Sequence, residues 1–145
     1  MSTVHDAGVD EIAPRTLYRI LALRSEVFVV EQDCVYLDLD GRDLEPDARQ
    51  VWIERDGEVI ATLRLLRDPD CARIGRVVTA PAARGGGVAA ALMTRAIELA
   101  GSVDVVLDAQ AHLADWYGRF GFVRDGAEFV EDGIPHVPMR RARPS

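Results

Sequence analysis

The chain lacks the features that mark secreted, membrane-spanning and nucleic-acid-binding proteins. Its two cysteines, Cys34 and Cys71, have no Cys-x-x-Cys spacing and no histidine nearby, which argues against a disulfide framework and a metal site. No apolar run reaches the length of about eighteen residues that spans a bilayer. Residues 1–6 lack the basic start and apolar stretch of a signal peptide. A net charge of −7 opposes nucleic-acid binding. We therefore expect a reduced, cytoplasmic protein that binds no metal, nucleic acid or membrane.

What is present fits an ordinary globular protein. The 145 residues are 48% hydrophobic and 28% charged, which predicts a single domain over 1–145 with a substantial core. The acidic balance weakly favours a cationic amine as ligand.

Hydrophobic periodicity predicts alternating helices and strands. Apolar residues recur at three- and four-residue spacing from Pro14 to Val30, which predicts a helix. Asp56-Gly57 is a strong hairpin signal between two strands. The other expected elements are strands at 50–54, 58–66, 73–79 and 103–107, a helix from 88 to about 101, a short helix at 113–119, and terminal strands around Phe122 and 137–139. This order predicts a mixed α/β (α+β) domain rather than a repeated βαβ array.

The segment from Val78 to Val88 is the most informative for function. A β-branched strand stops at Pro81, three glycines follow Arg84, and a helix begins at Val88. Glycines let a ligand approach the backbone closely, and the helix N-terminus directs free N–H groups toward the loop. The segment therefore predicts a cradle for a phosphate or pyrophosphate.

The spacing of residues in this loop distinguishes between known classes of nucleotide-binding site. A P-loop is excluded because Val88-Ala89 stands where Lys and Ser or Thr are needed. A Rossmann-like dinucleotide site remains open, since Ala90 and Asp108 could serve as its third small residue and its acidic residue.

Two motifs resemble one enzyme superfamily. Arg84-x-x-Gly87-x-Ala89 resembles the Gln/Arg-x-x-Gly-x-Gly/Ala pyrophosphate signature of GNAT-superfamily N-acetyltransferases. The stretch 108–122, ending in Tyr117-Gly118-Arg119-Phe120-Gly121-Phe122, resembles that superfamily's second cofactor motif. The resemblance implies a single GNAT-like domain with a central, largely antiparallel, splayed sheet flanked by helices.

A finer resemblance covers nearly the whole chain. The segment from Leu23 to Gln32, with Tyr36 and Asp40 after it, is similar to the ElaA-like branch of the superfamily. The same is true of Gln110-Ala111-His112 and of 131–136.

The resemblance implies direct transfer of an acetyl group from acetyl-CoA to a primary amine on a small molecule or peptide. Tyr117 would protonate the departing thiolate, and Glu31 and Asp40 would contact the acceptor. The implied cofactor-binding residues are Val77, Val78, Thr79, Arg84, Gly85, Gly86, Gly87, Val88, Ala89 and Gln110.

The general base is less clear. Many GNAT enzymes place a glutamate on the strand before the glycine loop, but residues 73–79 contain no carboxylate. Histidine can act near neutral pH without a pKa shift, so His112 and His136 are the catalytic candidates, ahead of three carboxylates. Those carboxylates are Glu31, Asp40 and Glu128.

Several alternatives stay open from the sequence. Asp38, Asp40 and Asp43 could form a collar for a cationic substrate or a solvated loop. The identity of the amine and the presence of a homodimer are undetermined. An acyl-CoA-binding sensor without turnover is the alternative function.

Overall fold

The computed structural model describes residues 3–145, so the first two residues of the predicted domain lie outside the described residues. Within this range, eight strands form one sheet in the order β1-β2-β3-β4-β5-β8-β6, and β7 pairs with β8. The strands are β1 (Val4–Ala7), β2 (Arg49–Arg55), β3 (Glu58–Arg67), β4 (Cys71–Thr79), β5 (Asp104–Gln110), β6 (Val123–Arg124), β7 (Phe129–Glu131) and β8 (Ile134–Arg141).

Along the chain, the helices lie between these strands. They are α1 (Pro14–Arg24), which continues as the π-helical turn η2 (Ser25–Glu31), α2 (Val88–Ala100) and α3 (Ala114–Gly118). Short 3-10 turns are η1 (Val9–Glu11), η3 (Arg42–Leu44), η4 (Pro81–Ala83) and η5 (Ala111–Leu113). The predicted helix at 14–30 is confirmed, with its last two turns in the wider π form. β1 and β7 are short strands that the sequence pattern did not predict.

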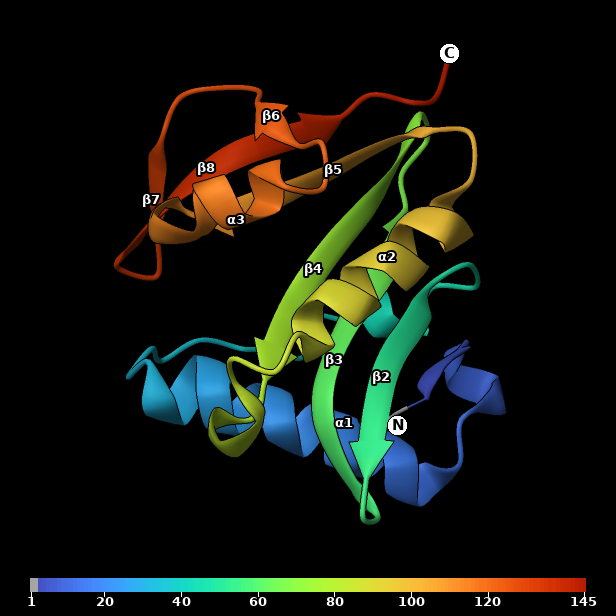
Figure 1. Cartoon of the computed structure of the whole chain (residues 1–145). Helices are drawn as coiled ribbons and strands as arrows, with labels where there is room; N and C mark the ends of the chain where they lie inside the picture. The colour runs from blue at the N-terminus through green and yellow to red at the C-terminus, as the bar shows by residue number, and fades with distance from the viewer. Residues whose placement is uncertain (1–2) are drawn as a thin grey trace.

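Alternate residues along the strands pack into two hydrophobic cores, one on each face of the sheet. Val51 and Ile53 pack toward α2, whereas Trp52, between them on β2, packs toward α1. Because strand side chains alternate in direction, α1 and α2 cover opposite faces of the sheet (Figure 1). Trp52 is 8% exposed, so the sheet is buried on both sides at β2.

The sheet is largely antiparallel, and it splays between its two halves. In the described chain, β4 and β5 form its parallel pair, and their pairing covers only Cys71–Arg73 opposite Asp104–Val106. Beyond these residues the two strands diverge, as Figure 1 shows. Residues from the rest of β4 and from β5 line a cleft between them. This confirms the expected splayed fold. It also excludes the Rossmann-like alternative, which needs a doubly wound parallel sheet.

A β-bulge bends β4 at the cleft. Thr62 pairs with Val78 and Arg64 pairs with Gly75, so β4 carries one residue more than β3 in this interval. Arg76 lies within the bulge and has a φ of +53°. Bulges bend a strand and interrupt its ladder, which accounts for the departure of β4 from β5.

Candidate active site

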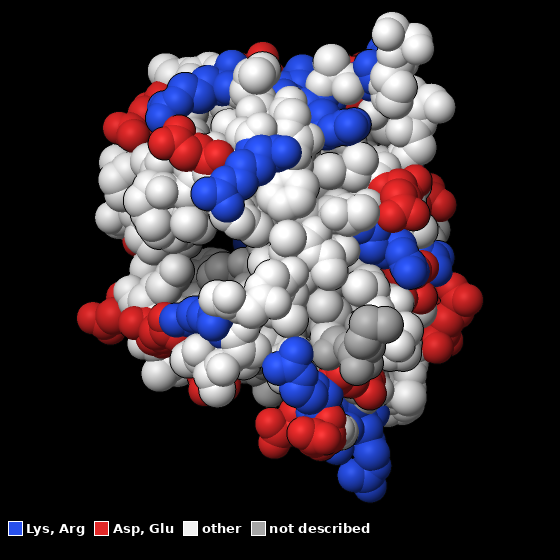
Figure 2. All heavy atoms as spheres, in the orientation of Figure 1, with Lys and Arg blue, Asp and Glu red and all other residues white. Residues whose placement is uncertain are grey.

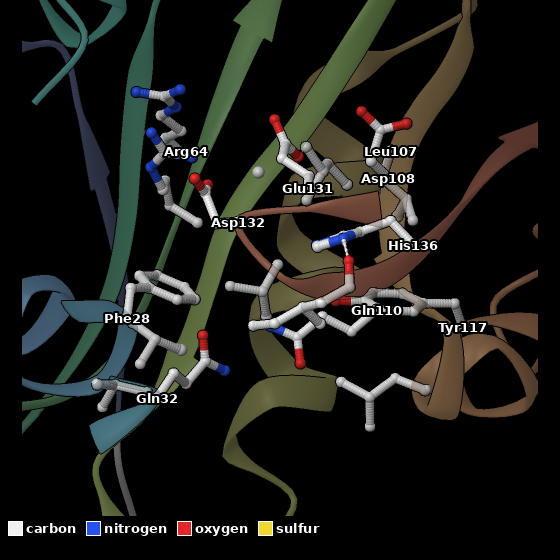
Figure 3. A pocket seen from close by; sticks show the side chains of 18 of the residues that line it. Phe28, Gln32, Arg64, Leu107, Asp108, Gln110, Tyr117, Glu131, Asp132 and His136 are labelled. Carbon is white, nitrogen blue, oxygen red and sulfur yellow. Dashed lines mark hydrogen bonds between the residues drawn. The ribbon is translucent and has the colours of Figure 1, made fainter. Parts of the chain in front are cut away.

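A cavity of about 920 Å³ fills the cleft between the two halves of the sheet. Its walls come from η2, from the end of β4, from β5 and α3, and from the turn between β7 and β8. Figure 2 shows the surface hollowed on the same side of the molecule, with acidic and basic side chains interspersed on this face. In Figure 3, Gln110, Tyr117 and His136 lie on one side of the cavity, across from Phe28 and Gln32 on η2.

The glycine loop has the backbone conformation expected for an anion cradle. Gly85 and Gly87 have φ values of +83° and +78°, which L-residues rarely adopt. The Ala91 amide donates to the Gly87 carbonyl at 3.2 Å, and the amides before Ala91 in the first turn have no intrahelical acceptor. Val88 is 8% exposed and packs in the core, so it can offer a ligand only its amide.

The predicted cofactor-binding residues differ in their access to the cavity. Arg84 and Ala89 line it, as do Val77, Val78, Thr79 and Gln110. Gly85, Gly86, Gly87 and Val88 are not among its lining residues over the described range. The Val78 side chain is 4% exposed and packs in the α1 core, which leaves its backbone for a ligand.

Tyr117 lies on α3 with its ring in the core and its hydroxyl end toward the cavity (Figure 3). The ring makes edge contacts with Trp116 and Phe122, at centroid distances of 4.9 and 6.4 Å. Burial raises the pKa of Tyr117 to about 12. The hydroxyl is therefore protonated at neutral pH.

The two candidate histidines differ in how they are held. His112 lies on η5, exposed at the edge of the cavity. His136 lies on β8 opposite Gln110, stacks on Phe129 at 5.7 Å, and has its Nδ1 2.7 Å from the Ile134 carbonyl oxygen. Because a carbonyl only accepts, this bond needs the proton on Nδ1 and leaves Nε2 of a neutral ring as a proton acceptor. Of the two, His136 has the fixed tautomer that a general base needs.

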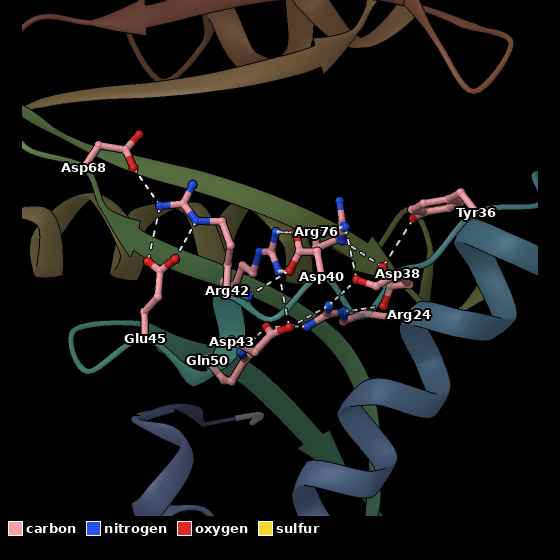
Figure 4. A network of polar contacts seen from close by, with 11 residues as sticks. Arg24, Tyr36, Asp38, Asp40, Arg42, Asp43, Glu45, Gln50, Asp68 and Arg76 are labelled. Carbon is pink, nitrogen blue, oxygen red and sulfur yellow. Dashed lines mark hydrogen bonds and ion pairs between the residues drawn. The ribbon is translucent and has the colours of Figure 1, made fainter.

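The three loop aspartates form neither a collar of free carboxylates nor a solvated loop. Arg24, fully buried, donates to Asp38 at 2.9 Å and to Asp43 at 2.7 Å. Arg64 donates to Asp40 at 2.6 Å and to Asp43 at 3.2 Å. This ion-pair cluster, extended by Arg76, Gln50 and Tyr36, lies beside α1 (Figure 4). Its members Tyr36, Asp40, Arg64 and Arg76 line the cavity.

The cluster decides the charge of the predicted acceptor residue Asp40. Hydrogen bonds from Arg64 hold the pKa of the Asp40 carboxyl far below its usual range, although burial opposes this shift. Asp40 lines the cavity as a fully ionised group that is already balanced by Arg64 and Arg76. An ionised carboxylate of such low pKa is a poor proton acceptor, so Asp40 is not a general base at neutral pH.

Glu31 and Arg84, predicted to serve acceptor and cofactor, contact each other. Both oxygens of Glu31 accept hydrogen bonds from Arg84, each at 2.8 Å. This contact lowers the pKa of Glu31, which disfavours it too as a base. Glu128, the remaining carboxylate candidate, is exposed and is not among the lining residues of the cavity in residues 3–145.

Several cavity residues escaped the sequence reasoning. They include Phe28, Gln32, Cys34 and the turn residue Asp132, whose carbonyl accepts a hydrogen bond from the Cys34 thiol at 3.3 Å. The buried cluster did leave a signal in the sequence. Arg24 occupies an apolar-face position of the first helix, and a charge at such a position requires buried partners.

Comparison with known proteins identifies the protein family. A model of the acetyltransferase (GNAT) domain matches residues 19–143. The structure superposes on an acyl-CoA N-acyltransferase from Pseudomonas aeruginosa with a TM-score of 0.93 and 44% identity, covering 98% of this chain and 100% of that one. The chain belongs to the GNAT acetyltransferase family.

Its place within the family follows from further relatives. The chain is 41% identical to the ElaA protein of Escherichia coli over 143 residues, 94% of each protein. The crystal structure of E. coli ElaA superposes with a TM-score of 0.92, at 38% identity, over 97% of this chain and 99% of that one. A UPF0039 protein of Mycobacterium tuberculosis is 49% identical over 90% of this chain and 87% of its own length. The expected ElaA-like resemblance is confirmed. No helix in the described residues is long and apolar enough to cross a membrane.

Proposed function

We propose that this protein is an acetyl-CoA-dependent N-acetyltransferase that moves the acetyl group directly to a primary amine. The observation that carries the proposal is the cleft between β4 and β5. It brings the two ends of the glycine loop, Arg84 and Ala89, to the same cavity as the buried Tyr117 and the oriented ring of His136. The family membership of the chain supports a transferase that uses an acyl-CoA.

In this proposal the loop from Arg84 to Ala89 binds the pyrophosphate of the co-substrate. The positive end of α2 and its free amides favour an anion there. The backbone of Val77 to Thr79 would pair with the pantetheine arm where β4 has left β5, and Gln110 would face it from β5. The thioester then lies near Tyr117, and the acceptor enters between η2 and the β7–β8 turn.

The reaction forms a C–N bond and breaks a C–S bond, and one proton of the amine is replaced by the acetyl group. An amine with a pKa near 10.4 is almost entirely protonated at pH 7, and its neutral form costs roughly 4.6 kcal/mol at that pH. We assign removal of this proton to Nε2 of His136, directly or through a water, with His112 as the second candidate.

The burial of Tyr117 changes the role that the resemblance implied. A tyrosine of pKa about 12 is a weaker acid than a thiol of pKa about 8.5, so complete proton transfer to the thiolate would cost about 5 kcal/mol. We therefore assign Tyr117 a hydrogen bond to the sulfur as the C–S bond breaks. The protonated amine loses two protons in all. His136 takes the first and releases it to solvent, and the second, lost as the C–N bond forms, is balanced by the proton that the sulfur finally carries.

Asp40 contributes to acceptor binding as a hydrogen-bond acceptor rather than as a free negative charge, because Arg64 and Arg76 balance it. Both of its oxygens accept hydrogen bonds from Arg64, which fixes the carboxylate at the cavity wall.

The test is turnover of acetyl-CoA with a panel of amines, polyamines and peptides, together with a calorimetric Kd for coenzyme A. Tyr117→Phe keeps the ring and removes the hydroxyl. We expect kcat to fall by about 10²- to 10³-fold, as for loss of one transition-state hydrogen bond, while the Kd changes little. A parent protein that binds coenzyme A but acetylates no amine would contradict the proposal and favour a sensor. An unchanged kcat in Tyr117→Phe would remove Tyr117 from the mechanism.

A further inference from the structure

One charged contact joins the two regions that the proposed function assigns to different substrates. Arg84 opens the glycine loop, and Glu31 is the last residue of η2, 53 positions earlier in the chain. The Nη1 and Nη2 atoms of Arg84 donate to Oε2 and Oε1 of Glu31, both at 2.8 Å. This bidentate geometry fixes the plane of the guanidinium as well as its position.

A third bond ties the same guanidinium to the sheet. The Nε of Arg84 donates to the carbonyl oxygen of Thr79, the last residue of β4, at 3.1 Å. Arg84 therefore connects the end of β4, the start of the glycine loop and the end of η2. Val27 and Phe28 of η2 line the cavity, so this connection also reaches the wall on which the acceptor would bind.

The local structure around Glu31 is unusual. The chain from Ser25 to Glu31 is π-helical, whereas α1 before it is regular. π-Helical turns are uncommon and occur frequently at functional sites, because they change the direction of the residues that follow. Here the turn ends at the residue that binds Arg84.

Resting on the proposed function, we propose that Glu31 is a positioning residue for the acyl-CoA. It acts through Arg84, holding the first residue of the glycine loop so that the following amides stay aligned for the pyrophosphate. Its role is pre-organisation of the loop, which strengthens binding by reducing the ordering that binding requires.

Whether coenzyme A binds more weakly or more tightly without the Glu31 charge distinguishes a positioning role from electrostatic repulsion. A carboxylate near a pyrophosphate repels it, so removing the Glu31 charge should strengthen binding if repulsion dominates. If Glu31 holds the loop, the same change should weaken binding. Both side chains are about two-fifths exposed, at 41% and 44%, and exposed pairs of this kind contribute modestly.

The experiment compares Glu31→Gln with the parent protein by calorimetry, using two ligands: coenzyme A and S-acetyl-pantetheine, which lacks the pyrophosphate. We expect about two- to fivefold weaker binding of coenzyme A and unchanged binding of the fragment. Glu26→Gln is the matched control, because Glu26 is exposed on the same turn and has no ion-pair partner in the described residues. It should bind both ligands as the parent does.

A double variant tests whether Glu31 acts through Arg84. In the background of Arg84→Ala, the further change Glu31→Gln should have no effect on the Kd for coenzyme A. Equal or tighter binding in Glu31→Gln, an equal loss for the fragment, or an additive double variant would overturn the inference while leaving the proposed function intact. A parent protein that does not bind coenzyme A would instead overturn the proposed function.

Discussion

Replacing Arg24 with methionine should destabilise the fold more than any exposed charge change. Arg24 is fully buried and donates four hydrogen bonds within the cluster, two of them to Asp43 and two to Asp38. Methionine fills a similar volume but leaves the carboxylates of Asp38 and Asp43 without this cation (Figure 4). Arg64 and Arg76 remain to balance part of the charge.

The expected magnitude follows from breaking a buried pair on one side. Such changes cost about 3–5 kcal/mol, because a buried charge is left uncompensated. Domains of this kind have total stabilities of about 5–15 kcal/mol, so the loss is a large fraction of the whole. At about 2–4 °C per kcal/mol, the Tm should fall by roughly 6–20 °C.

The pH dependence supplies a second measurement of the same contact. Burial alone would raise the pKa of the Asp43 carboxyl, but the hydrogen bonds and charge of Arg24, together with Gln50 and the charge of Arg64, hold the pKa below its ordinary value. A depressed carboxylate pKa contributes stability above its unfolded value of about 3.9, and this stability is lost as the pH falls through the folded pKa. Arg24→Met removes the main group that lowers this pKa. The stability difference between parent and variant should therefore narrow as the pH falls from about 7 toward 3.

Urea denaturation at several pH values measures both effects. Arg19→Met is the matched control, since Arg19 lies exposed on the same helix. It should change the free energy of unfolding by less than about 0.5 kcal/mol. A loss below about 1 kcal/mol in Arg24→Met at neutral pH, or a difference that does not change with pH, would refute the reasoning.

Two further predictions concern the cavity. Gly87→Val should weaken coenzyme A binding at least tenfold, or about 1.4 kcal/mol, because Gly87 has a φ of +78° and its side chain would enter the anion cradle. Gly86→Ala, where a Cβ meets only the Ala83 carbonyl at an ordinary 3.6 Å, should bind normally, and equal affinities in the two variants would contradict the placement. His136→Gln should lower kcat most near neutral pH and less at high pH, where the acceptor amine loses its proton unaided. A loss that is the same at every pH would make His136 a structural residue stacked on Phe129.

The glycine loop and the sheet could be predicted because their signals are local. Positive φ at Gly85 and Gly87, the strand end near Pro81 and the hairpin at Asp56-Gly57 each depend on residues close in the chain. Backbone chemistry of this kind is visible in a short window of sequence. The residues of the proposed anion cradle therefore follow from the amino-acid sequence alone.

The acceptor side could not be predicted in the same way, because it depends on pairs far apart in the chain. Arg24 finds Asp38 and Asp43 across 14 and 19 positions, and Arg64 finds Asp40 across 24. Nothing in the spacing of the aspartates distinguishes a solvated loop from buried partners of arginine. Arg24 on an apolar helix face indicates that buried acidic partners exist. The sequence alone does not say which loop covers that face and supplies them.

β4 has no carboxylate, and the ion-pair cluster places a positive group on this strand. At the bulge, Arg76 faces the cavity and is balanced by Asp38 and Asp40, so a positive group stands on the strand where many GNAT enzymes have a glutamate. The proposed base lies on the other wall, where His136 projects from β8 into the cavity. The anion cradle and the ion-pair cluster belong to the chain before residue 101, and the proton-handling groups belong to the chain after it. β4 and β5 pair only at Cys71–Arg73. Beyond that point the two halves of the chain face each other across the cleft with no backbone hydrogen bonds between these strands. A substrate that spans the cleft would therefore connect the residues that bind it to the residues that act on it.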